Sequence, residues 1–290
     1  MPEVTIGMPV YNDVNFIEQS IECILKQSFQ DFELIISDDC SIDGCDIICK
    51  KYCEKDSRIK YIRQEKNIGI SKNMKFLLNI ANTKYFMWAG DDDVLEPTFI
   101  EKLIHKLEST NNCVSVFCTF SYIDENSVQI ENEQNFDYSS PNRLRRLFNF
   151  FKKPNDIFGY GIFVTSEIKN VDFPIWWWPN KNIPYNNIFP SLCFYLAKSN
   201  YAHHYDKPLF YKRVKPSLMT NYSITSKIGY KDILAYILRR FYLVCFSSKM
   251  INRSGGLFLS SVCFPVLLYR WFFLSSIKEI CSAVKSKITL

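Results

Sequence analysis

Residues 85–93 of this 290-residue chain read YFMWAGDDD, an apolar run that ends in the consecutive aspartates Asp91, Asp92 and Asp93. Adjacent carboxylates repel one another, and burying them without partners is costly. A strand with this ending presents its acidic groups at the carboxyl edge of a sheet, where a divalent cation can offset their charge. Acidic residues also cap helices, and Pro97 and Thr98 resemble a helix start, but a cap requires one acid rather than three. The stretch therefore favours a site for a metal ion and a phosphate group.

The sequence around this run alternates between strand and helix patterns. Strands are expected at 4–10, 32–36, 59–62, 84–89 and 114–118, and helices at 16–25, 41–54, 71–81 and 99–107, the third of them capped by Ser71. Repeated strand–helix units predict an α/β fold with a mostly parallel central sheet flanked by helices. In such sheets ligands bind at the carboxyl ends of the strands.

Polar residues follow three of the expected strands: Tyr11 after the first, Asp38 and Asp39 after the second, and 91–93 after the fourth. Tyr11 can stack on a flat ring, and a carboxylate such as Asp39 can accept a hydrogen bond from a ring N–H. The acidic triplet can hold a cation that bridges two phosphates. The alternatives are a helix cap for the aspartates and a packed surface aromatic for Tyr11. Taken together, the three loops predict a site that binds a heterocycle, a ribose and a diphosphate.

Five segments then resemble family 2 glycosyltransferases, which are inverting enzymes with the glycosyltransferase-A fold. The order and spacing of the segments match over about residues 3–110. The segments are Pro9–Asn12, Gln27–Glu33, Asp38–Gly44, Asn67–Gly69 and Gly90–Pro97.

The resemblance implies a role for each donor-binding residue. Tyr11 and the backbone of Pro9 would line the nucleobase pocket, and Asp39 would accept the base N–H with Asp38 beside it. Asn67 and Lys72 lie where the family's loop and helix start approach the donor. For these last two residues, a turn and an ordinary first-turn helix position are equally good interpretations.

The resemblance also implies a metal site for Mn²⁺ or Mg²⁺. Asp92 matches the metal-binding aspartate of the family's D-x-D motif, but the first aspartate of that motif falls on Gly90. Asp91 or Asp93 would then take over its role. We therefore expect Asp92 and Asp93 as metal ligands and Asp91 beside the ribose or the metal.

Other nucleotide-binding folds fit less well. The chain has neither G-x-G-x-x-G nor G-x-x-x-x-G-K-[ST]. A sugar-phosphate nucleotidyltransferase would carry a glycine-rich loop after its first strand, where this chain has Met8–Tyr11.

The chain is expected to divide into a nucleotide-sugar-binding half at 1–118, an acceptor-binding half of the same catalytic domain at 119–225, and a tail at 226–290. In the second part, Phe158–Phe163 resembles the family's returning strand, and Pro208–Arg213 resembles its closing segment. Lys212 or Arg213 could reach the diphosphate; the alternative is the solvated end of an edge strand.

Inverting transfer needs a general base for the acceptor hydroxyl. The family usually has a carboxylate about twenty residues before its closing segment, but no Asp or Glu occurs at 173–205, and Tyr185–Phe189 offers only amides, which cannot act as a base. The catalytic residue therefore stays unknown. The substitutes are Asp156, Asp172, His203 and His204, each with a structural role as its alternative.

Three consecutive tryptophans stand at 176–178. They could form an acceptor platform, pack in the core or contact a membrane interface.

The tail is basic and aromatic. From residue 226 onward, ten Lys or Arg stand against two acidic residues, a net +8, which leaves −3 for residues 1–225 of the total of +5. The net charge of residues 1–225 therefore argues against nucleic-acid binding by that part of the chain.

The apolar run Leu257–Tyr269 in the tail is broken by Ser260, Ser261 and Pro265, whereas a spanning helix needs about 20 apolar residues. We expect a helical tail that binds an anionic membrane surface; the alternative is a helix packed on the catalytic domain or on a second copy in a homo-oligomer.

The eleven cysteines have no metal-type spacing, and no signal peptide is visible, which indicates a cytoplasmic protein, here peripheral on the inner face of the plasma membrane. The expected function is metal-dependent, inverting transfer of a sugar from a nucleotide-diphosphate donor to a lipid-linked surface glycan. The alternative is a catalytically weak sugar-nucleotide-binding subunit that partners an active transferase.

Overall fold

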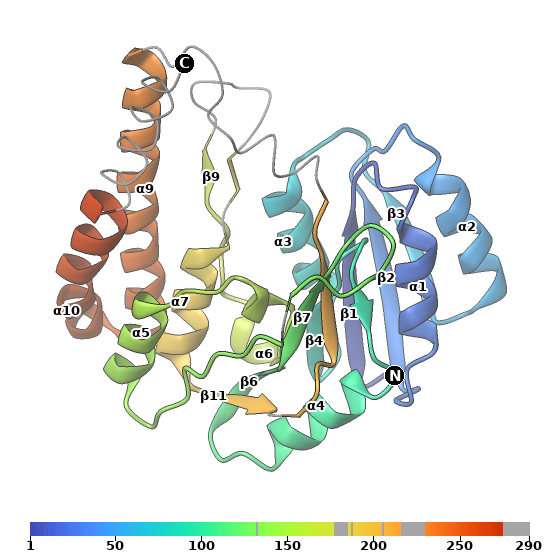
Figure 1. The fold of residues 1–290 in the computed structure, drawn as a ribbon, viewed down its shortest axis with the longest axis horizontal. Helices are drawn as coiled ribbons and strands as arrows, with labels where there is room; N and C mark the ends of the chain where they lie inside the picture. Colours follow the sequence, from blue (N-terminus) through green and yellow to red (C-terminus); the bar gives the residue numbers. More distant parts are fainter. Residues whose placement is uncertain (132, 177–184, 187, 205, 216–229, 275–290) are drawn as a thin grey trace.

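A seven-stranded sheet forms the centre of the molecule, in the order β11-β6-β8-β4-β1-β2-β3 (Figure 1). The computed structural model describes residues 1–131, 133–176, 185–186, 188–204, 206–215 and 230–274. The strands of the sheet are β1 (Val4–Val10), β2 (Phe32–Asp38), β3 (Ile59–Arg63), β4 (Tyr85–Trp88), β6 (Cys113–Cys118), β8 (Ile162–Val164) and β11 (Asn200–His204). All strands except β8 run in one direction. The predicted mostly parallel sheet is therefore confirmed.

Four helices follow strands of the first half, as their apolar spacing predicts. They are α1 (Ile17–Leu25), α2 (Cys45–Lys55), α3 (Ile70–Ile80) and α4 (Phe99–Glu108). Helix α1 buries Ile17, Ile21 and Ile24, which recur on one face at a period of three to four residues. Helix α3 packs on β1 and β2, and α4 packs on β6, β8 and β11.

One predicted helix start and one predicted helix cap are wrong. Helix α2 begins at Cys45 rather than at 41, after Gly44 adopts a left-handed φ of 102°, a conformation that glycine adopts readily. Helix α3 begins at Ile70, and Ser71 does not cap it: the Ser71 hydroxyl donates to the carbonyl of Pro174 at 3.1 Å.

The two halves of the chain share the central sheet. Strand β8 enters between β4 and β6 from the second half, preceded by the short 3₁₀ helix η1 (Ile157–Tyr160). A Cβ atom on Gly161 would lie 2.2 Å from the carbonyl oxygen of Val116, so only glycine allows this close approach.

A second, three-stranded sheet brings the closing segment to the acidic triplet. Strand β12 (Phe210–Arg213) runs parallel to β7 (Phe120–Ile123) and antiparallel to β5 (Val94–Leu95). Because β5 directly follows 91–93 in the chain, this pairing holds residues 210–213 beside the three aspartates.

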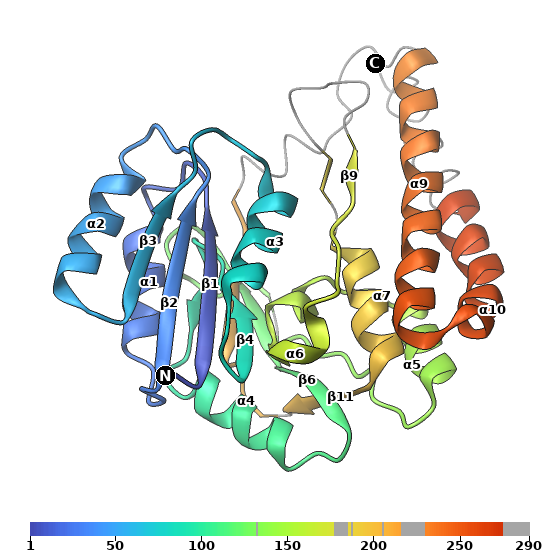
Figure 2. The ribbon, with the colours of Figure 1, turned by 180° about the vertical axis from the view of Figure 1, so that it is seen from behind.

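The C-terminal region is helical, as predicted, and lies at the end of the molecule opposite α2 (Figures 1 and 2). Helix α9 (Tyr230–Gly255) packs on α7 (Phe189–Lys198) and α10 (Leu257–Leu267), and α10 also contacts α5 (Arg143–Lys152). A π-helical segment, η2 (Leu268–Leu274), continues α10. The remaining short elements are α6 (Thr165–Ile168), β9 (Ile175–Trp176) and β10 (Tyr185–Asn186).

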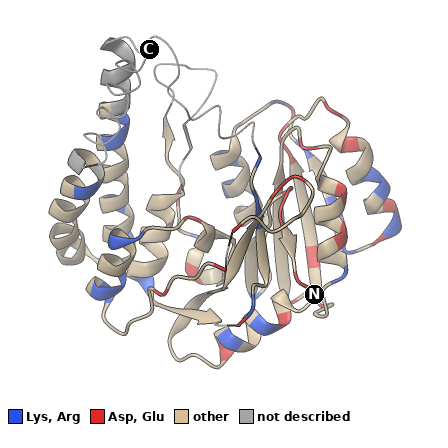
Figure 3. Ribbon diagram, viewed as in Figure 1, with Lys and Arg blue, Asp and Glu red and all other residues tan. Residues whose placement is uncertain are grey.

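Helix α9 and the segment η2 carry positive charge, and α10 carries exposed apolar side chains. Residues 237–274 include five Lys or Arg and no acidic residue; four of the five lie on α9, where Figure 3 shows blue segments, and the fifth is Arg270 of η2. The apolar side chains of Leu257 and Phe258 are 72% and 78% exposed. Among the described residues, no helix combines the length and the apolar character that a membrane crossing would need.

Candidate functional site

The loops after β1, β2 and β4 lie at one edge of the sheet. Val10 lies opposite Asp38 across β1 and β2, and Gly7 lies opposite Trp88 across β1 and β4. Because these parallel strands end side by side, the polar residues that follow them are neighbours.

The conformation of Asn12 joins the first two loops. Its φ of 53° is left-handed, a region that asparagine tolerates better than most residues. The Asn12 N–H donates to Ser41 Oγ at 2.9 Å, and its side-chain oxygen accepts the N–H of Ile42 at 2.9 Å. These contacts fix the next residue, Asp13, at the same edge.

Three carboxylates converge at this edge. One ligand oxygen from each of Asp13, Asp91 and Asp92 lies within 4.8 Å of the other two. Carboxylate oxygens are the ligands that Mg²⁺ and Mn²⁺ prefer, so this donor set fits a divalent cation. The sequence predicted Asp92 as a ligand at this site but did not predict Asp13. The one feature of the sequence that could have indicated Asp13 is its position directly after Tyr11 and Asn12.

The charge at the cluster is unevenly compensated. Burial raises the pKa of Asp91 well above its usual value, and the carboxylates of Asp13 and Asp92 raise it further. Burial also raises the pKa of Asp13, against the opposing effect of Lys215. Burial would raise the pKa of Asp92 too, but the ammonium groups of Lys212 and Lys215 more than offset it and lower that pKa. The lysine ammonium groups thus favour the charged form of Asp92, whereas the charged form of Asp91 is disfavoured.

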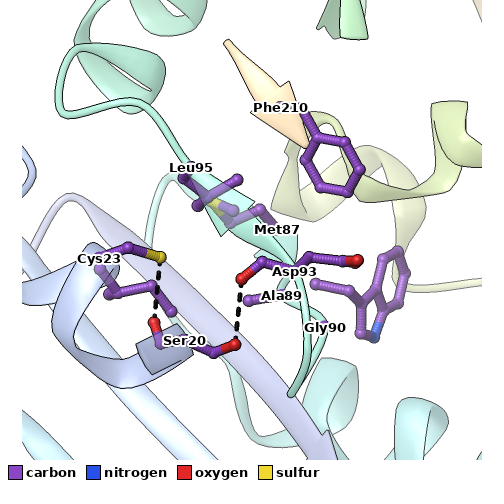
Figure 4. Close-up of a pocket in the computed structure, with 10 residues that line it drawn as sticks. Ser20, Cys23, Met87, Ala89, Gly90, Asp93, Leu95 and Phe210 are labelled. Carbon is purple, nitrogen blue, oxygen red and sulfur yellow. Dashed lines mark hydrogen bonds between the residues drawn. The ribbon is translucent and has the colours of Figure 1, made fainter. Parts of the chain in front are cut away.

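The carboxylate of Asp93 lies outside this cluster and anchors β12. It accepts the N–H of Arg213 at 3.1 Å and the ammonium of Lys212 at 3.0 Å, and burial raises its pKa to about 6. Its carbonyl accepts the Ser20 hydroxyl at 3.0 Å (Figure 4). A Cβ on Gly90 would lie 2.3 Å from the Asp93 carboxylate. The geometry therefore brings Asp92, and not the predicted Asp93, to the candidate metal site. It also explains why glycine stands at position 90, where the family motif has an aspartate: a side chain there would collide with the Asp93 carboxylate.

A cavity of about 10 Å³ lies behind this turn, lined by residues that include Ser20, Cys23 and Phe210 (Figure 4). Such a volume holds at most one water molecule. It therefore cannot be the pocket for a nucleotide.

Arg213 holds the turn and a neighbouring loop together. Its side chain is 2% exposed, so it does not reach a ligand as one interpretation of the sequence suggested. The guanidinium donates to the carbonyls of Asp92, Asp124 and Glu125 and to the side chains of Gln19 and Ser127, over 2.6–3.0 Å.

The two aspartates after β2 have different surroundings. Asp38 is fully buried and accepts the N–H of Ser41, the Tyr61 hydroxyl and the Arg63 guanidinium. This arrangement favours a structural role. Asp39 instead accepts two backbone N–H groups from residues 68 and 69, at 2.7 and 2.9 Å, and burial raises its pKa. Asp39 is only 3% exposed, but, unlike Arg213, it has bonding capacity left, because each carboxylate oxygen has a second lone pair that could accept a base N–H.

The other predicted donor-binding residues lie around the same edge. Tyr11 is 50% exposed, and its N–H approaches a carboxylate oxygen of Asp91 at 3.4 Å. Pro9 is partly buried near the end of β1, and Lys72 is exposed on the first turn of α3. Asn67 is exposed, and its side-chain oxygen accepts the N–H of residue 69 at 3.1 Å, as the turn interpretation predicts.

Of the candidates for the general base, Asp156 has the best position. It is exposed and directly precedes η1. Because β8 is antiparallel to β4, with Ile162 opposite Met87, the segment before β8 lies at the edge that carries the acidic cluster. Tyr160, at the end of η1, lies beside the cluster, because its ring is 4.8 Å from the ammonium of Lys212.

The other candidates are used structurally. Asp172 forms an ion pair with Arg253 of α9 and lies 3.7 Å from the ammonium of Lys75 on α3. His203 is 3% exposed and bonds to the Tyr201 hydroxyl at 2.7 Å, and burial lowers its pKa to about 4. Burial also lowers the pKa of His204. Asn187, Trp177 and Trp178, which the sequence singled out, lie outside the described residues.

Comparison with known proteins gives a consistent result. Residues 5–139 match the model of Glycosyl transferase family 2. The chain is similar to Glycosyltransferase GlyA of Streptococcus pneumoniae, at 31% identity over 120 residues that cover 41% of this chain and 17% of that protein. It is also similar to the putative glycosyltransferase EpsE of Bacillus subtilis, at 33% identity over 129 residues that cover 44% of this chain and 46% of that protein. The match thus spans less than half the length of either relative.

Solved structures share the fold over a longer part of the chain. The structure of S. aureus TarS 1–349 in complex with UDP-GlcNAc matches with a TM-score of 0.61 and 16% identity, covering 87% of this chain and 72% of that one. The mannosyltransferase PcManGT of Pyrobaculum calidifontis, in complex with GDP-Man and Mn²⁺, matches with a TM-score of 0.53 and 13% identity, covering 99% of this chain and 81% of that one. At these identities the likeness is one of fold.

Proposed function

We propose that this chain is a metal-dependent, inverting glycosyltransferase, because residues 5–139 match the model of Glycosyl transferase family 2. The observation that carries the proposal is the convergence of Asp13, Asp91 and Asp92 at the carboxyl edge of the sheet. The cluster adjoins Tyr11, whose N–H faces Asp91. A nucleobase beside Tyr11 would therefore place its diphosphate next to the carboxylates.

The proposed donor site uses the residues around that edge. Tyr11 would stack on the base, with the Pro9 backbone, Asp39 and Asn67 around it, and Lys72 would face the donor's phosphates. Asp38 would support Asp39 through the buried β2 loop.

The carboxylates of Asp13, Asp91 and Asp92 would hold Mn²⁺ or Mg²⁺. Such an ion supplies charge neutralisation for the leaving diphosphate. The same carboxylates would orient the donor so that the anomeric carbon faces the acceptor side of the sheet edge.

For the chemical step we propose Asp156 as the general base. Its carboxylate would take the proton of the acceptor hydroxyl while the hydroxyl oxygen bonds to the anomeric carbon from the face opposite the leaving group. The bond from that carbon to the diphosphate oxygen breaks at the same time, and the nucleoside diphosphate leaves with the electron pair. The exposure of Asp156 supports this role, since a base must reach an external hydroxyl.

The test is donor binding followed by transfer. A thermal-shift panel of nucleotide sugars with and without Mn²⁺ should begin with UDP-GlcNAc and GDP-mannose, the donors bound in the two structural neighbours. We expect stabilisation by one donor that depends on Mn²⁺, and release of its nucleoside diphosphate with acceptor glycans. Transfer should fall at least about 100-fold in Asp156→Asn, with donor binding unchanged.

Other results would favour other functions. Donor binding without turnover on any acceptor would favour the sugar-nucleotide-binding subunit, which the absence of Asp and Glu at 173–205 motivates. Pyrophosphate release from a nucleoside triphosphate would instead identify a nucleotidyltransferase. Absence of any nucleotide binding would contradict the proposal.

We further propose that α9, α10 and η2 bind an anionic membrane surface on the cytoplasmic side and so bring the site to a lipid-linked acceptor. Five basic residues at 237–274 and the exposed side chains of Leu257 and Phe258 support this role. The full chain should sediment with phosphatidylglycerol vesicles, less at high salt, and weakly with phosphatidylcholine alone. Replacing both Leu257 and Phe258 by Ser should weaken binding about tenfold.

The matched control is Ile47→Ser, which removes an equally exposed apolar side chain (70%) from α2, at the opposite end of the molecule. Equal binding of the chain to phosphatidylglycerol and phosphatidylcholine vesicles would contradict the proposed membrane surface. So would a loss of vesicle binding in Ile47→Ser as large as the loss in the double variant. Self-association of the chain that the double variant abolishes would point to a homo-oligomer instead.

A further inference from the structure

The ammonium group of Lys215 lies on the carboxylates that form the candidate metal site. Its Nζ is 2.9 Å from Asp92 Oδ2 and also contacts Asp13 Oδ2. Two of the three ligands that a divalent cation would use are therefore bridged by a side chain of the protein itself. The Lys215 side chain is only 17% exposed, so the contact is largely shielded from water.

Lys212 makes a different contact, although it lies near the same carboxylates. Its Nζ is 3.0 Å from Asp93 and 3.8 Å from the other oxygen of Asp92, Oδ1. Lys212 belongs to β12 and pairs with Tyr122 of β7 in that sheet. Lys215 follows Val214, whose N–H donates to the carbonyl of residue 123. Lys212 is thus fixed by a strand, whereas the ammonium of Lys215 is held by Asp13 and Asp92.

A divalent cation and the Lys215 ammonium cannot share these oxygens. A metal ion would lie about 2.0–2.2 Å from each ligand oxygen. An ammonium group bonded to the same two oxygens would then repel the metal ion at close range, without water between the two positive charges. The donor brings two phosphate groups to the same place, and an ammonium released there would find new acceptors on the phosphate oxygens.

We propose that Lys215 and the divalent cation alternate on Asp13 and Asp92. Without metal, the ammonium of Lys215 holds the two carboxylates together and keeps the site assembled. When the cation binds, Lys215 leaves these oxygens and becomes available to the donor's diphosphate. This inference rests on the proposed function, because it assumes that the carboxylates hold a metal.

The experiment measures Mn²⁺ binding to the full chain without nucleotide, by calorimetry or by electron paramagnetic resonance. Lys215→Met keeps the length of the side chain and removes the competing charge, so it should bind Mn²⁺ at least about tenfold more tightly than wild type. Lys215→Arg keeps a cation and should stay near wild type. Lys60→Met removes a lysine that pairs with Glu33 on the distant β2–β3 surface and should change nothing.

A second measurement follows the lysine directly. Acylation of Lys215, read by mass spectrometry, should increase at least about threefold when Mn²⁺ is added to wild type, while acylation of Lys60 stays constant. Unchanged Mn²⁺ affinity in Lys215→Met, or unchanged acylation of Lys215, would overturn the alternation and leave metal-dependent transfer standing.

Failure of the proposed function would have a different signature. If neither wild type nor Lys215→Met binds Mn²⁺, and the donor binds equally well without it, the metal site itself is wrong and the alternation falls with it. If, in addition, Lys215→Met loses donor binding, the ammonium acts as a permanent cation in place of the metal.

Discussion

Asp92→Asn should abolish Mn²⁺-dependent donor binding and lower transfer at least about 100-fold. Asp92 is central to the acidic cluster, since its two oxygens lie near Lys212 and Lys215 and one of them also lies within 4.8 Å of ligand oxygens of Asp13 and Asp91. The amide of Asn has nearly the same shape but one oxygen and no charge. Donor affinity with and without Mn²⁺, measured by calorimetry, gives the result directly.

The control for this variant is Asp46→Asn. Asp46 lies on α2 and pairs with Lys50 on the surface, so the same chemical change there should leave Mn²⁺-dependent donor affinity unchanged. Thermal unfolding of Asp92→Asn should remain cooperative, which would separate a binding defect from a folding defect. A folded Asp92→Asn protein with wild-type Mn²⁺ dependence would refute the assigned metal site.

Arg213→Met should lower the free energy of unfolding by about 3–5 kcal/mol, the largest stability effect that we expect from a single substitution outside the apolar core. The change removes the donors to three backbone carbonyls, those of Asp92, Asp124 and Glu125. The contact with the Asp92 carbonyl is buried, and those with Asp124 and Glu125 are partly buried. A fully buried carbonyl without a donor costs about 1–3 kcal/mol, and a partly exposed one costs less. For a chain of this size the melting temperature should fall by about 6–15 °C, which thermal or urea unfolding would measure.

Arg145→Met provides the comparison, because Arg145 is exposed on α5. Its loss should change the free energy of unfolding by about 0.5 kcal/mol or less. Equal stability of the two variants would mean that water replaces the Arg213 guanidinium without cost, and the network around it would then lose its proposed role in fixing the acidic turn.

The sequence predicted the strands and most helices of the first half because they combine regular apolar spacing with clear polar ends. The residues 84–93 are an example: four buried positions of β4 are followed, after Ala89 and Gly90, by three aspartates. The second half was harder to predict. Strand β8 has only three residues, too few for a periodic signal, and the β12 strand forms because of partners far away in the chain.

The site was predicted only as far as local sequence defines it. Asp92 and Tyr11 stand beside recognisable strands, so their place at the sheet edge could be inferred. Asp13 could not be identified, because its orientation depends on the left-handed Asn12 and on contacts with the loop after β2. Lys215 could not be identified either, because it reaches Asp13 across 202 residues of sequence.

Strand β12 also has a consequence for how the protein matures during synthesis. Asp93 finds its partners Lys212 and Arg213 at sequence separations of 119 and 120 residues. A nascent chain that has emerged only as far as the central strands therefore carries its run of acids without the cations that later compensate them. Loop closure over such a distance is slow compared with the formation of local helices. The acidic turn can thus gain these partners only after strand β12 has left the ribosome.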